Sequence, residues 1–265
     1  MLSTNQTKRN SKVVPEMGII KRDPYLAPYE SAIKGRHDHA LWKLNQLTQG
    51  GKFSLSEFAN GYQYYGLHHE SDGWIFREWA PNATDIYLVG DFNNWQETIA
   101  YKCKRDVDTG DWELKLPEDA IQHGQFYKMH VYWNGGKGER IPAWAQRVVQ
   151  DPQTGIFSAQ VWSPNAPYVW KINSFNPQTS PLLIYECHIG MGQDAEKVGT
   201  YNEFREKVLP RIVKDGYNAI QIMAIQEHPY YGSFGYHVSS FFAPSSRFGT
   251  PEELKALVDD AHEAG

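Results

Sequence analysis

The chain has 265 residues, of which 41% are hydrophobic and 22% charged, and its formal net charge is −5. This composition is ordinary for a globular protein and gives no reason to expect a nucleic acid or an anionic membrane as a partner. No apolar run approaches the roughly 20 residues of a membrane-spanning helix, and Cys103 and Cys187 are too few for a disulfide framework. The N-terminus lacks the apolar stretch of a secretory signal. We therefore expect a cytoplasmic protein.

The first part of the chain predicts a polar tail over residues 1–22 and an N-terminal helical segment over residues 23–61. The sequence "QGG" at 49–51 should end the first helix. Ser54, with Glu57 three residues later, should cap a second, shorter helix. Apolar residues at near-helical spacing indicate the first helix: Ile33, Leu41, Leu44 and Leu47.

Residues 62–172 change to a period of two, which indicates strands. Trp112, Leu114 and Leu116 should face one side of a strand, with polar residues between them on the other side. Short alternating runs separated by turn-rich pieces predict an antiparallel β-sandwich, immunoglobulin-like, of about 100 residues. The expected strands cover residues 73–80, 85–90, 111–117 and 125–133. A Pro- and Asn-rich linker follows at 163–181.

Residues 173–265 read as the beginning of a parallel α/β unit. We expect buried strands at 182–190 and 217–225, with a helix at 201–216 between them that is bent or interrupted near Pro210. The closing helix, 251–264, should be capped by Thr250 and Glu253 and should end at Gly265. A (β/α)8 barrel fits this order. A doubly wound sheet would look the same over so short a length, but no Gly-rich phosphate loop supports it.

Aromatic residues make up 14% of the chain, and some of them stand where they could bind sugar. In "GDFNNW" a turn holds Trp95 at a strand edge, and "YKMHVYWNGG" carries Lys128 and Trp133. Stacking rings beside hydrogen-bonding groups suit sugar rings and their hydroxyls. The alternative interpretation is a core of large side chains with Trp95 as a hydrophobic plug. Alternation places Lys128 and Trp133 on opposite strand faces, so a bend or bulge is needed before both touch one ligand.

A second group of residues has the chemistry of metal ligands but not the spacing. We expect no metal and no cofactor. Glu186 and His188 are interpreted as a hydrogen-bonded structural pair, and Cys187 as a small buried residue rather than a thiol nucleophile. The full group is Glu186, His188, Glu227, His228 and His237.

Several long motifs, in order, resemble the eukaryotic-type α-glucan branching enzymes of glycoside hydrolase family 13. They are "DPYLAPY" (23–29), "EWAPNATDIYLVGDFNNW" (78–95), "IPAWA" (141–145), "IYECHIG" (184–190) and the stretch 209–265. The resemblance covers nearly the whole chain. It implies a helical segment, a β-sandwich carbohydrate-binding module and a (β/α)8 TIM barrel, here truncated at Gly265 after two βα units.

The resemblance also implies site residues and a partner. The partner would be an α-glucan: glycogen, amylose or a maltooligosaccharide. Trp95, Lys128 and Trp133 match glucan-contacting positions of the module, whereas Trp79, Pro81 and Gly110 are candidates for a neighbouring groove. In the barrel, Tyr236 matches a tyrosine that stacks on the sugar at the cleavage subsite, and His237 stands where the family usually has Gln. Ser245, Ser246 and Arg247 are expected to brace the loop.

The activity implied is a glycosyl transfer that cleaves an α-1,4 chain and makes an α-1,6 branch with retention of configuration. Such chemistry needs a nucleophilic Asp and an acidic Glu, which the family carries on later barrel strands. We therefore expect no catalytic residue in this chain, with both carboxylates beyond Gly265, and an inactive chain on its own. Glu186, Asp259 and Asp260 lie on the wrong elements to replace them.

Two alternatives stay open: a standalone glucan-binding or scaffold protein, and an isoamylase-like debranching glycosidase. If the chain truly stops at Gly265, Leu254, Leu257 and Val258 should lack much of their burial, and residues 182–265 should be poorly folded.

Overall fold

The computed structural model describes residues 18–177 and 181–265. Most of the expected polar tail, residues 1–17, lies outside the described residues. The chain divides into two compact units, Met1–Gly61 and Tyr62–Gly265. Each unit is described by itself.

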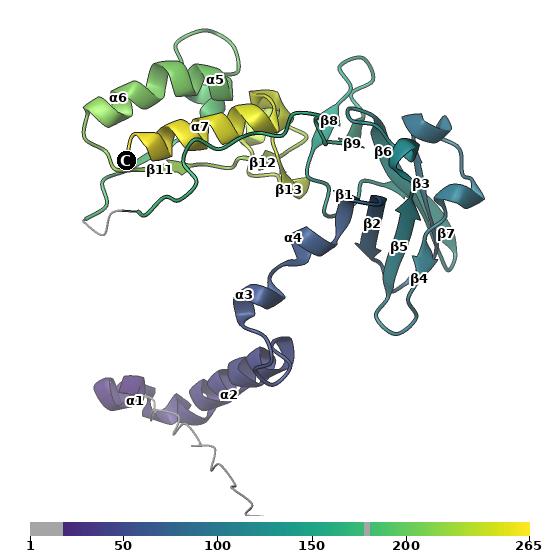
Figure 1. Cartoon of the computed structure of the whole chain (residues 1–265). Helices are drawn as coiled ribbons and strands as arrows, with labels where there is room; N and C mark the ends of the chain where they lie inside the picture. The colour runs from purple at the N-terminus through teal and green to yellow at the C-terminus, as the bar shows by residue number, and fades with distance from the viewer. Residues whose placement is uncertain (1–17, 178–180) are drawn as a thin grey trace, which may run out of the picture. The chain divides into compact units, whose positions relative to one another are not determined.

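The first unit consists of helices, as predicted. It contains α1 (Gly18–Arg22), the 3-10 turn η1 (Pro24–Tyr29), α2 (Glu30–Leu47) and α3 (Leu55–Phe58), and α4 (Gly61–Tyr64) lies at its boundary (Figure 1). The capping box is confirmed: Ser54 Oγ accepts from the N–H of Glu57 at 3.1 Å, and Glu57 Oε2 accepts from the N–H of Ser54 at 2.7 Å. Helix α2 ends where predicted, because Gln49 and Gly50 adopt left-handed backbone conformations.

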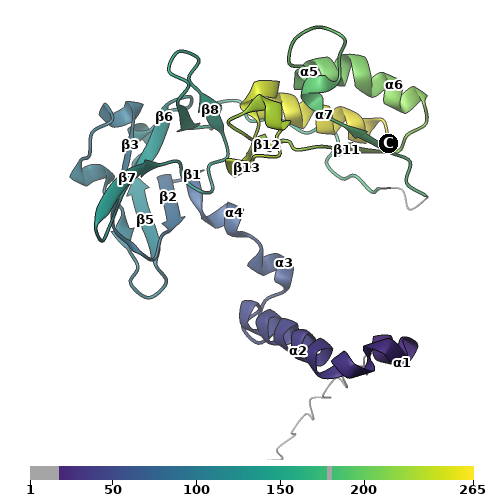
Figure 2. The ribbon, with the colours of Figure 1, turned by 180° about the vertical axis from the view of Figure 1, so that it is seen from behind.

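The second unit begins with two antiparallel sheets that face each other (Figures 1 and 2). One sheet has the order β1-β2-β5-β4, and the other has the order β3-β6-β9-β8 with β7 paired to β6. The first sheet contains β1 (Gly66–Glu70), β2 (Gly73–Trp79), β4 (Lys104–Arg105) and β5 (Asp111–Leu116). The second contains β3 (Ala83–Gly90), β6 (Phe126–Trp133), β7 (Gly136–Arg140), β8 (Val148–Gln150) and β9 (Phe157–Gln160).

The sandwich core forms from alternate residues of both sheets, as expected when one face of each strand is buried. Trp112, Leu114 and Leu116 are buried on the inner face of β5, as the alternation predicted. Phe76, Ile86, Leu88 and Met129 pack in the same cluster. The strands predicted from sequence are confirmed as β2, β3, β5 and β6.

The rest of the second unit is built around a parallel strand pair, β10 (Ile184–Cys187) and β11 (Ala219–Ile222). Between them lie α5 (Tyr201–Glu203), the π-helical turn η6 (Phe204–Val208) and α6 (Leu209–Lys214). The predicted interruption near Pro210 is confirmed: proline has no N–H to donate, and the turn just before it widens to the π form. Short strands β12 (Gln226–Glu227) and β13 (Ser240–Pro244) pair antiparallel. Single 3-10 turns complete the description: η2 (Asp91–Asn93), η3 (Ile99–Tyr101), η4 (Glu118–Ala120), η5 (Ile189–Met191), η7 (Tyr231–Ser233) and η8 (Ser246–Phe248).

The closing helix α7 (Pro251–Glu263) has the predicted ends. Thr250 and Glu253 form a capping box, and Gly265 has φ +89°. The expectation that Leu257 lacks burial is wrong, because its side chain is only 2% exposed and packs in one cluster with Phe204, Leu209 and Phe248. Those residues lie before α7 in the chain, so no later strand is needed to cover Leu257.

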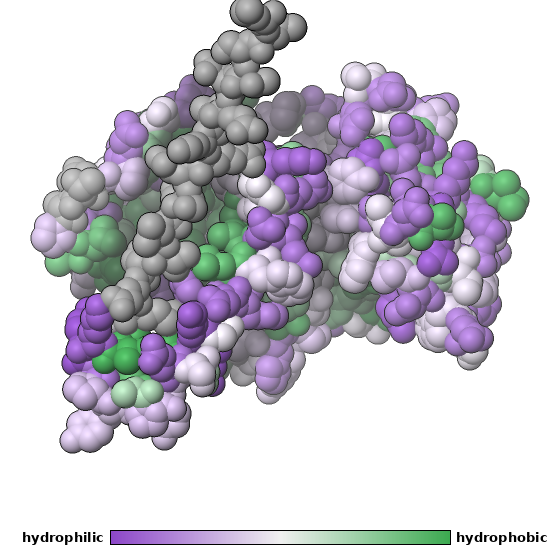
Figure 3. Space-filling model, turned by 90° about the horizontal axis from the view of Figure 1, so that it is seen from below, coloured by the Kyte–Doolittle hydropathy of each residue, from purple (hydrophilic) through white to green (hydrophobic). Residues whose placement is uncertain are grey.

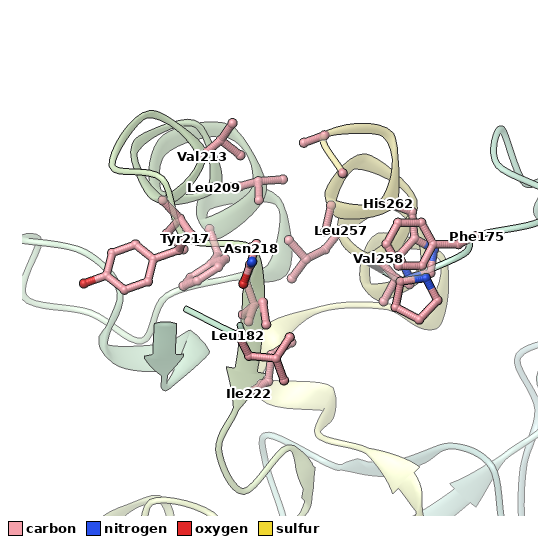
Figure 4. A pocket seen from close by; sticks show the side chains of 18 residues that line it. Phe175, Leu182, Leu209, Val213, Tyr217, Asn218, Ile222, Leu257, Val258 and His262 are labelled. Atoms are coloured by element: carbon pink, nitrogen blue, oxygen red, sulfur yellow. The ribbon is translucent and has the colours of Figure 1, made fainter. Parts of the chain in front are cut away.

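The expectation that the two parallel strands are buried is wrong for both: one of the four residues of β10 is buried, and none of the four residues of β11 is. Leu182, Leu183 and Ile184 are 60%, 58% and 47% exposed. The helices α6 and α7 cover one face of the pair, and an apolar cleft of about 320 Å³ opens between them and β11 (Figure 4). Leu209 and Val213 reach into it from α6, and Leu257 comes from α7.

The predicted linker after the sandwich is packed against α7. Asp259 accepts hydrogen bonds from the Tyr168 hydroxyl at 2.8 Å and from the N–H of Lys171 and Ile172 at 2.8 and 3.0 Å. Indole Nε1 of Trp162 donates to Glu252 at 2.9 Å, which also joins the sandwich to this helix.

The surface of the described residues is mostly polar in the view from below, with apolar side chains in separate patches (Figure 3). Within the described ranges, none of the helices combines the length and the apolar character needed to cross a membrane.

Candidate functional site

The Trp95 cleft is an open depression of about 400 Å³ on the sandwich. Its lining comes from the turn after β3, from β6 and β7, and from the hairpin that joins β8 to β9. It contains Asp91, Trp95, Phe126, Lys128, Glu139, Val149, Asp151, Thr154, Ile156 and Ser158. An aromatic ring, an ammonium group, carboxylates and hydroxyls therefore share one surface, as binding of a polyhydroxylated ligand requires.

The sequence "GDFNNW" folds as a tight turn that fixes the backbone of Trp95. Asn93 accepts from the N–H of Gly90 at 2.9 Å and donates its amide to the carbonyl of Leu88 at 3.0 Å. Asn94 and Trp95 then adopt left-handed conformations, with φ of 54° and 60°. Left-handed backbone is uncommon outside glycine, and these side-chain bonds hold it in place.

Lys128 is paired within the Trp95 cleft. Its Nζ lies 3.0 Å from Glu139 Oε2, and its side chain is only 12% exposed. The hydrogen bond and charge of Lys128 hold the pKa of Glu139 below its ordinary value. His130 Nε2 lies 3.5 Å from the same carboxylate. An ionised acceptor and a charged donor therefore stand together in the cleft.

Trp133 is not part of the Trp95 cleft. Strand β6 pairs with β3 through a register shift that lies on β3, between Ala83 and Asp85, so β6 itself carries no bulge. Alternation therefore keeps Trp133 on the face opposite Lys128. Its ring lies beneath the guanidinium of Arg140, whose Cζ is 5.3 Å from the ring centroid. The structure thus brings Trp95 and Lys128 together but leaves Trp133 apart.

The three weaker candidates of the sandwich form their own group. Trp79 is 58% exposed, and its Nε1 donates to the carbonyl of Thr109 at 3.1 Å. Gly110 has φ +80°, and a Cβ there would approach Pro81 to 2.8 Å. Trp79, Pro81 and Gly110 therefore meet at the turn before β5, where the tryptophan is more than half exposed.

Tyr236 and His237 lie on an exposed loop between β12 and β13. Tyr236 is 64% exposed. Gly235 has φ +88°, and any side chain there would collide with the carbonyl oxygen of Ala224. Only glycine is compatible with this path, so the sequence "GYH" sets where Tyr236 and His237 emerge.

Glu227 closes the base of this loop. It is fully buried and accepts from the N–H of His228 at 3.0 Å and from the N–H of Ser246 at 2.7 Å. Ser245 Oγ lies 3.5 Å from the same carboxylate. Arg247 donates to the carbonyl of Pro229 at 2.9 Å. The predicted bracing role of Ser245, Ser246 and Arg247 agrees with these contacts.

The expected pair of Glu186 and His188 is not formed. Glu186 is exposed on β10, whereas His188 is buried and its Nε2 lies 3.1 Å from the carbonyl oxygen of Phe234. Burial lowers the pKa of His188. Cys187 is a buried free thiol, and burial raises its pKa to about 11. Among the described residues, no three His, Cys, Asp or Glu side chains gather as a set of metal ligands.

Sequence reasoning missed Asp91 and Glu139 as cleft residues. Asp91 stood inside the quoted "GDFNNW" motif, where its spacing to Trp95 was the available signal. Glu139 belongs to β7, whose sequence "GKGER" has none of the β-branched or aromatic residues that indicate a strand. The β8–β9 hairpin that supplies the opposite wall was missed for a related reason, because its strands are only three and four residues long.

Comparison with known proteins gives three results. The family carbohydrate-binding module 48 (isoamylase N-terminal domain) matches residues 64–153, which include the sandwich strands up to β8. The 1,4-alpha-glucan-branching enzyme of Dictyostelium discoideum is 43% identical over 96% of this chain, and that of Aspergillus oryzae is 45% identical over 94%. The chain spans 38% and 37% of the lengths of these relatives.

Solved structures show the same fold at lower identity. A pullulanase from Bacillus acidopullulyticus superposes with a TM-score of 0.62 at 19% identity, covering 76% of this chain and 28% of that one. A pullulanase from Paenibacillus barengoltzii, in complex with maltohexaose and alpha-cyclodextrin, gives a TM-score of 0.61 at 21% identity over 83% of this chain and 40% of that one. These likenesses concern the fold alone.

Proposed function

We propose that this chain, which belongs by sequence to the family of 1,4-α-glucan-branching enzymes, binds α-glucan in the Trp95 cleft of its sandwich. The single observation that carries the proposal is the meeting of Trp95 and Lys128 in one cleft of a module that matches a carbohydrate-binding family. A pyranose ring would stack on Trp95. Its hydroxyls would donate to Glu139 and accept from Lys128.

We further propose that β10, β11 and their helices are the first two βα units of a (β/α)8 barrel. The exposed apolar side chains at the start of β10 and just before it, and the apolar cleft beside β11, support this, because they are the surfaces that further strands would cover. Tyr236 and His237 lie on the loop that follows β11, and in a barrel such loops build the active site. Their contact with substrate is part of the proposal.

The activity we propose for the whole protein is branch formation: cleavage of an α-1,4 chain and its transfer to a 6-hydroxyl, with retention. A retaining mechanism needs two carboxyl groups about 5–5.5 Å apart. Asp259 and Glu186 do not suit that role, because Asp259 is occupied by hydrogen bonds to the linker and Glu186 is the one carboxylate on β10. The reacting carboxylates would therefore belong to the part of the family that this chain does not span.

The test is the affinity of the 265-residue chain for maltoheptaose, measured by isothermal titration calorimetry. Trp95→Ala should weaken binding about tenfold or more, which corresponds to about 1.4 kcal/mol. Trp170→Ala removes a tryptophan that is 39% exposed outside the sandwich and should leave the affinity unchanged. Equal affinities of the parent and Trp95→Ala would contradict the proposed site, and a loss confined to Trp79→Ala would move it to the turn before β5.

A further inference from the structure

The Trp95 cleft contains a carboxylate whose two oxygens both have partners. Asp91 Oδ1 accepts from the indole Nε1 of Trp95 at 3.0 Å, and Asp91 Oδ2 accepts from the N–H of Phe126 at 2.7 Å. Asp91 opens the turn η2, whereas Phe126 is the first residue of β6. One side chain therefore connects the aromatic ring to the strand that carries Lys128.

This arrangement fixes the plane of the ring. An indole is oriented by two side-chain torsions, and the bond at Nε1 constrains both. It also occupies the one hydrogen-bond donor of the side chain, so Trp95 has only its ring face and edge to offer a ligand. The backbone of Asn94 and Trp95 is left-handed, a conformation that persists only where the surrounding structure holds it.

We infer that Asp91 is a positioning residue for glucan binding, which it supports by holding the Trp95 ring at a set orientation relative to Lys128. The inference rests on the proposed function of the Trp95 cleft. Lys128 lies two residues after Phe126 on the same strand face, and Glu139 holds its ammonium. The Trp95 ring and the Lys128 ammonium are thus both held in position before a ligand binds, which reduces the side-chain conformational entropy that is lost on binding.

The chemistry requires a carboxylate at this position. Two N–H donors converge on Asp91, so two acceptor oxygens are needed. Asparagine has the same shape but only one acceptor, and its amide N–H would face one of the two donors. Asp91→Asn therefore changes hydrogen bonding while it keeps the volume of the side chain.

The experiment is a double-mutant cycle on the 265-residue chain with maltoheptaose as the probe. Asp91→Asn should weaken binding about five- to tenfold in the parent and should cause no further loss in the Trp95→Ala background. Glu118→Gln, which alters an exposed carboxylate paired with His69, is the matched control and should bind like the parent. Parent-like affinity of Asp91→Asn, or an equal loss in both backgrounds, would overturn the inference.

The outcomes separate this inference from the proposed function. If Trp95→Ala itself binds like the parent, the proposed cleft is wrong. If Trp95→Ala weakens binding and Asp91→Asn does not, only the positioning role is wrong. A measurement on the parent avoids any effect on folding: the indole N–H resonance of Trp95, assigned by its loss in Trp95→Ala, should be protected from solvent exchange. Fast exchange of that proton would also overturn the inference.

Discussion

Replacing Glu227 by glutamine tests how the loop that carries Tyr236 and His237 is held. Glu227 is fully buried, and it accepts from the N–H of His228, where the loop begins, at 3.0 Å and from the N–H of Ser246, just after β13, at 2.7 Å. A hydrogen bond to a charged acceptor contributes about 1.5–3 kcal/mol. Glutamine keeps one acceptor oxygen and turns an N–H toward the second donor, so one bond is lost and the buried amide is left without a partner.

The neighbouring charge adds to this cost. Burial lowers the pKa of Arg147, and the negative charge of Glu227 counteracts that effect. Without the carboxylate, the Arg147 guanidinium loses a favourable partner. We therefore expect Glu227→Gln to lower the free energy of unfolding by about 2–4 kcal/mol.

The assay is urea unfolding followed by tryptophan fluorescence, with Glu186→Gln as the matched control. Glu186 is exposed on β10, and substitutions at such positions usually change stability by less than about 0.5 kcal/mol. The reasoning is refuted if Glu227→Gln and Glu186→Gln unfold at the same urea concentration with the same slope.

Three further predictions concern stability. Leu257→Ala should lower the free energy of unfolding by about 2–4 kcal/mol, because the side chain is only 2% exposed. Leu182→Ala should lower it by less than about 1 kcal/mol, because Leu182 is 60% exposed. Equal losses of stability in urea unfolding would contradict the packing of α7. Burial alone would raise the pKa of Asp259, but hydrogen bonds from the N–H groups of the linker and from the Tyr168 hydroxyl outweigh that effect and lower it. The stabilisation that the Asp259 carboxylate provides is therefore present above pH 3.8 and is lost as the pH falls further. Asp259→Asn should thus have a lower melting temperature than the parent near neutral pH, and the difference should become smaller below about pH 4. A difference in melting temperature that does not depend on pH would refute this prediction. Gly110→Ala should destabilise the sandwich by about 1–3 kcal/mol in thermal unfolding, because it strains a left-handed residue and crowds Pro81; an unchanged melting temperature would contradict it.

The elements that sequence predicted best are those whose signals are local. The capping residues Ser54 and Thr250 marked helix starts because their hydroxyls bond within the next turn. The alternation of Trp112, Leu114 and Leu116 marked a strand because one face of β5 is buried. Pro210 marked the interruption before α6 because proline cannot donate.

What sequence did not predict depends on contacts distant in the chain. The packing of the linker was not predicted, because its partner, Asp259, lies about 90 residues further on. Strands β10 and β11 were predicted to be buried because the two segments are largely apolar, but exposure depends on which elements pack against them, and most of their residues are not buried. The family resemblance grouped Trp133 with Lys128, but the register of β6 against β3 keeps the two residues on opposite faces of β6, as the alternation of the strand indicated.

The candidate site was predicted in part for the same reason. Trp95 and Lys128 belong to long aromatic motifs with a clear pattern, and the structure places both in one cleft. Glu139 and Asp91 gain their importance from side-chain partners, Lys128 and Trp95, that only the folded chain brings within reach.

A crystal structure of the 265-residue chain with maltoheptaose would show whether α-glucan binds in the Trp95 cleft. We expect a glucose ring stacked on the Trp95 face, with hydroxyls within hydrogen-bond distance of Lys128 and Glu139 and with the hydrogen bond between Trp95 and Asp91 intact. A glucan bound on Trp79 or elsewhere, with the Trp95 cleft empty, would contradict it.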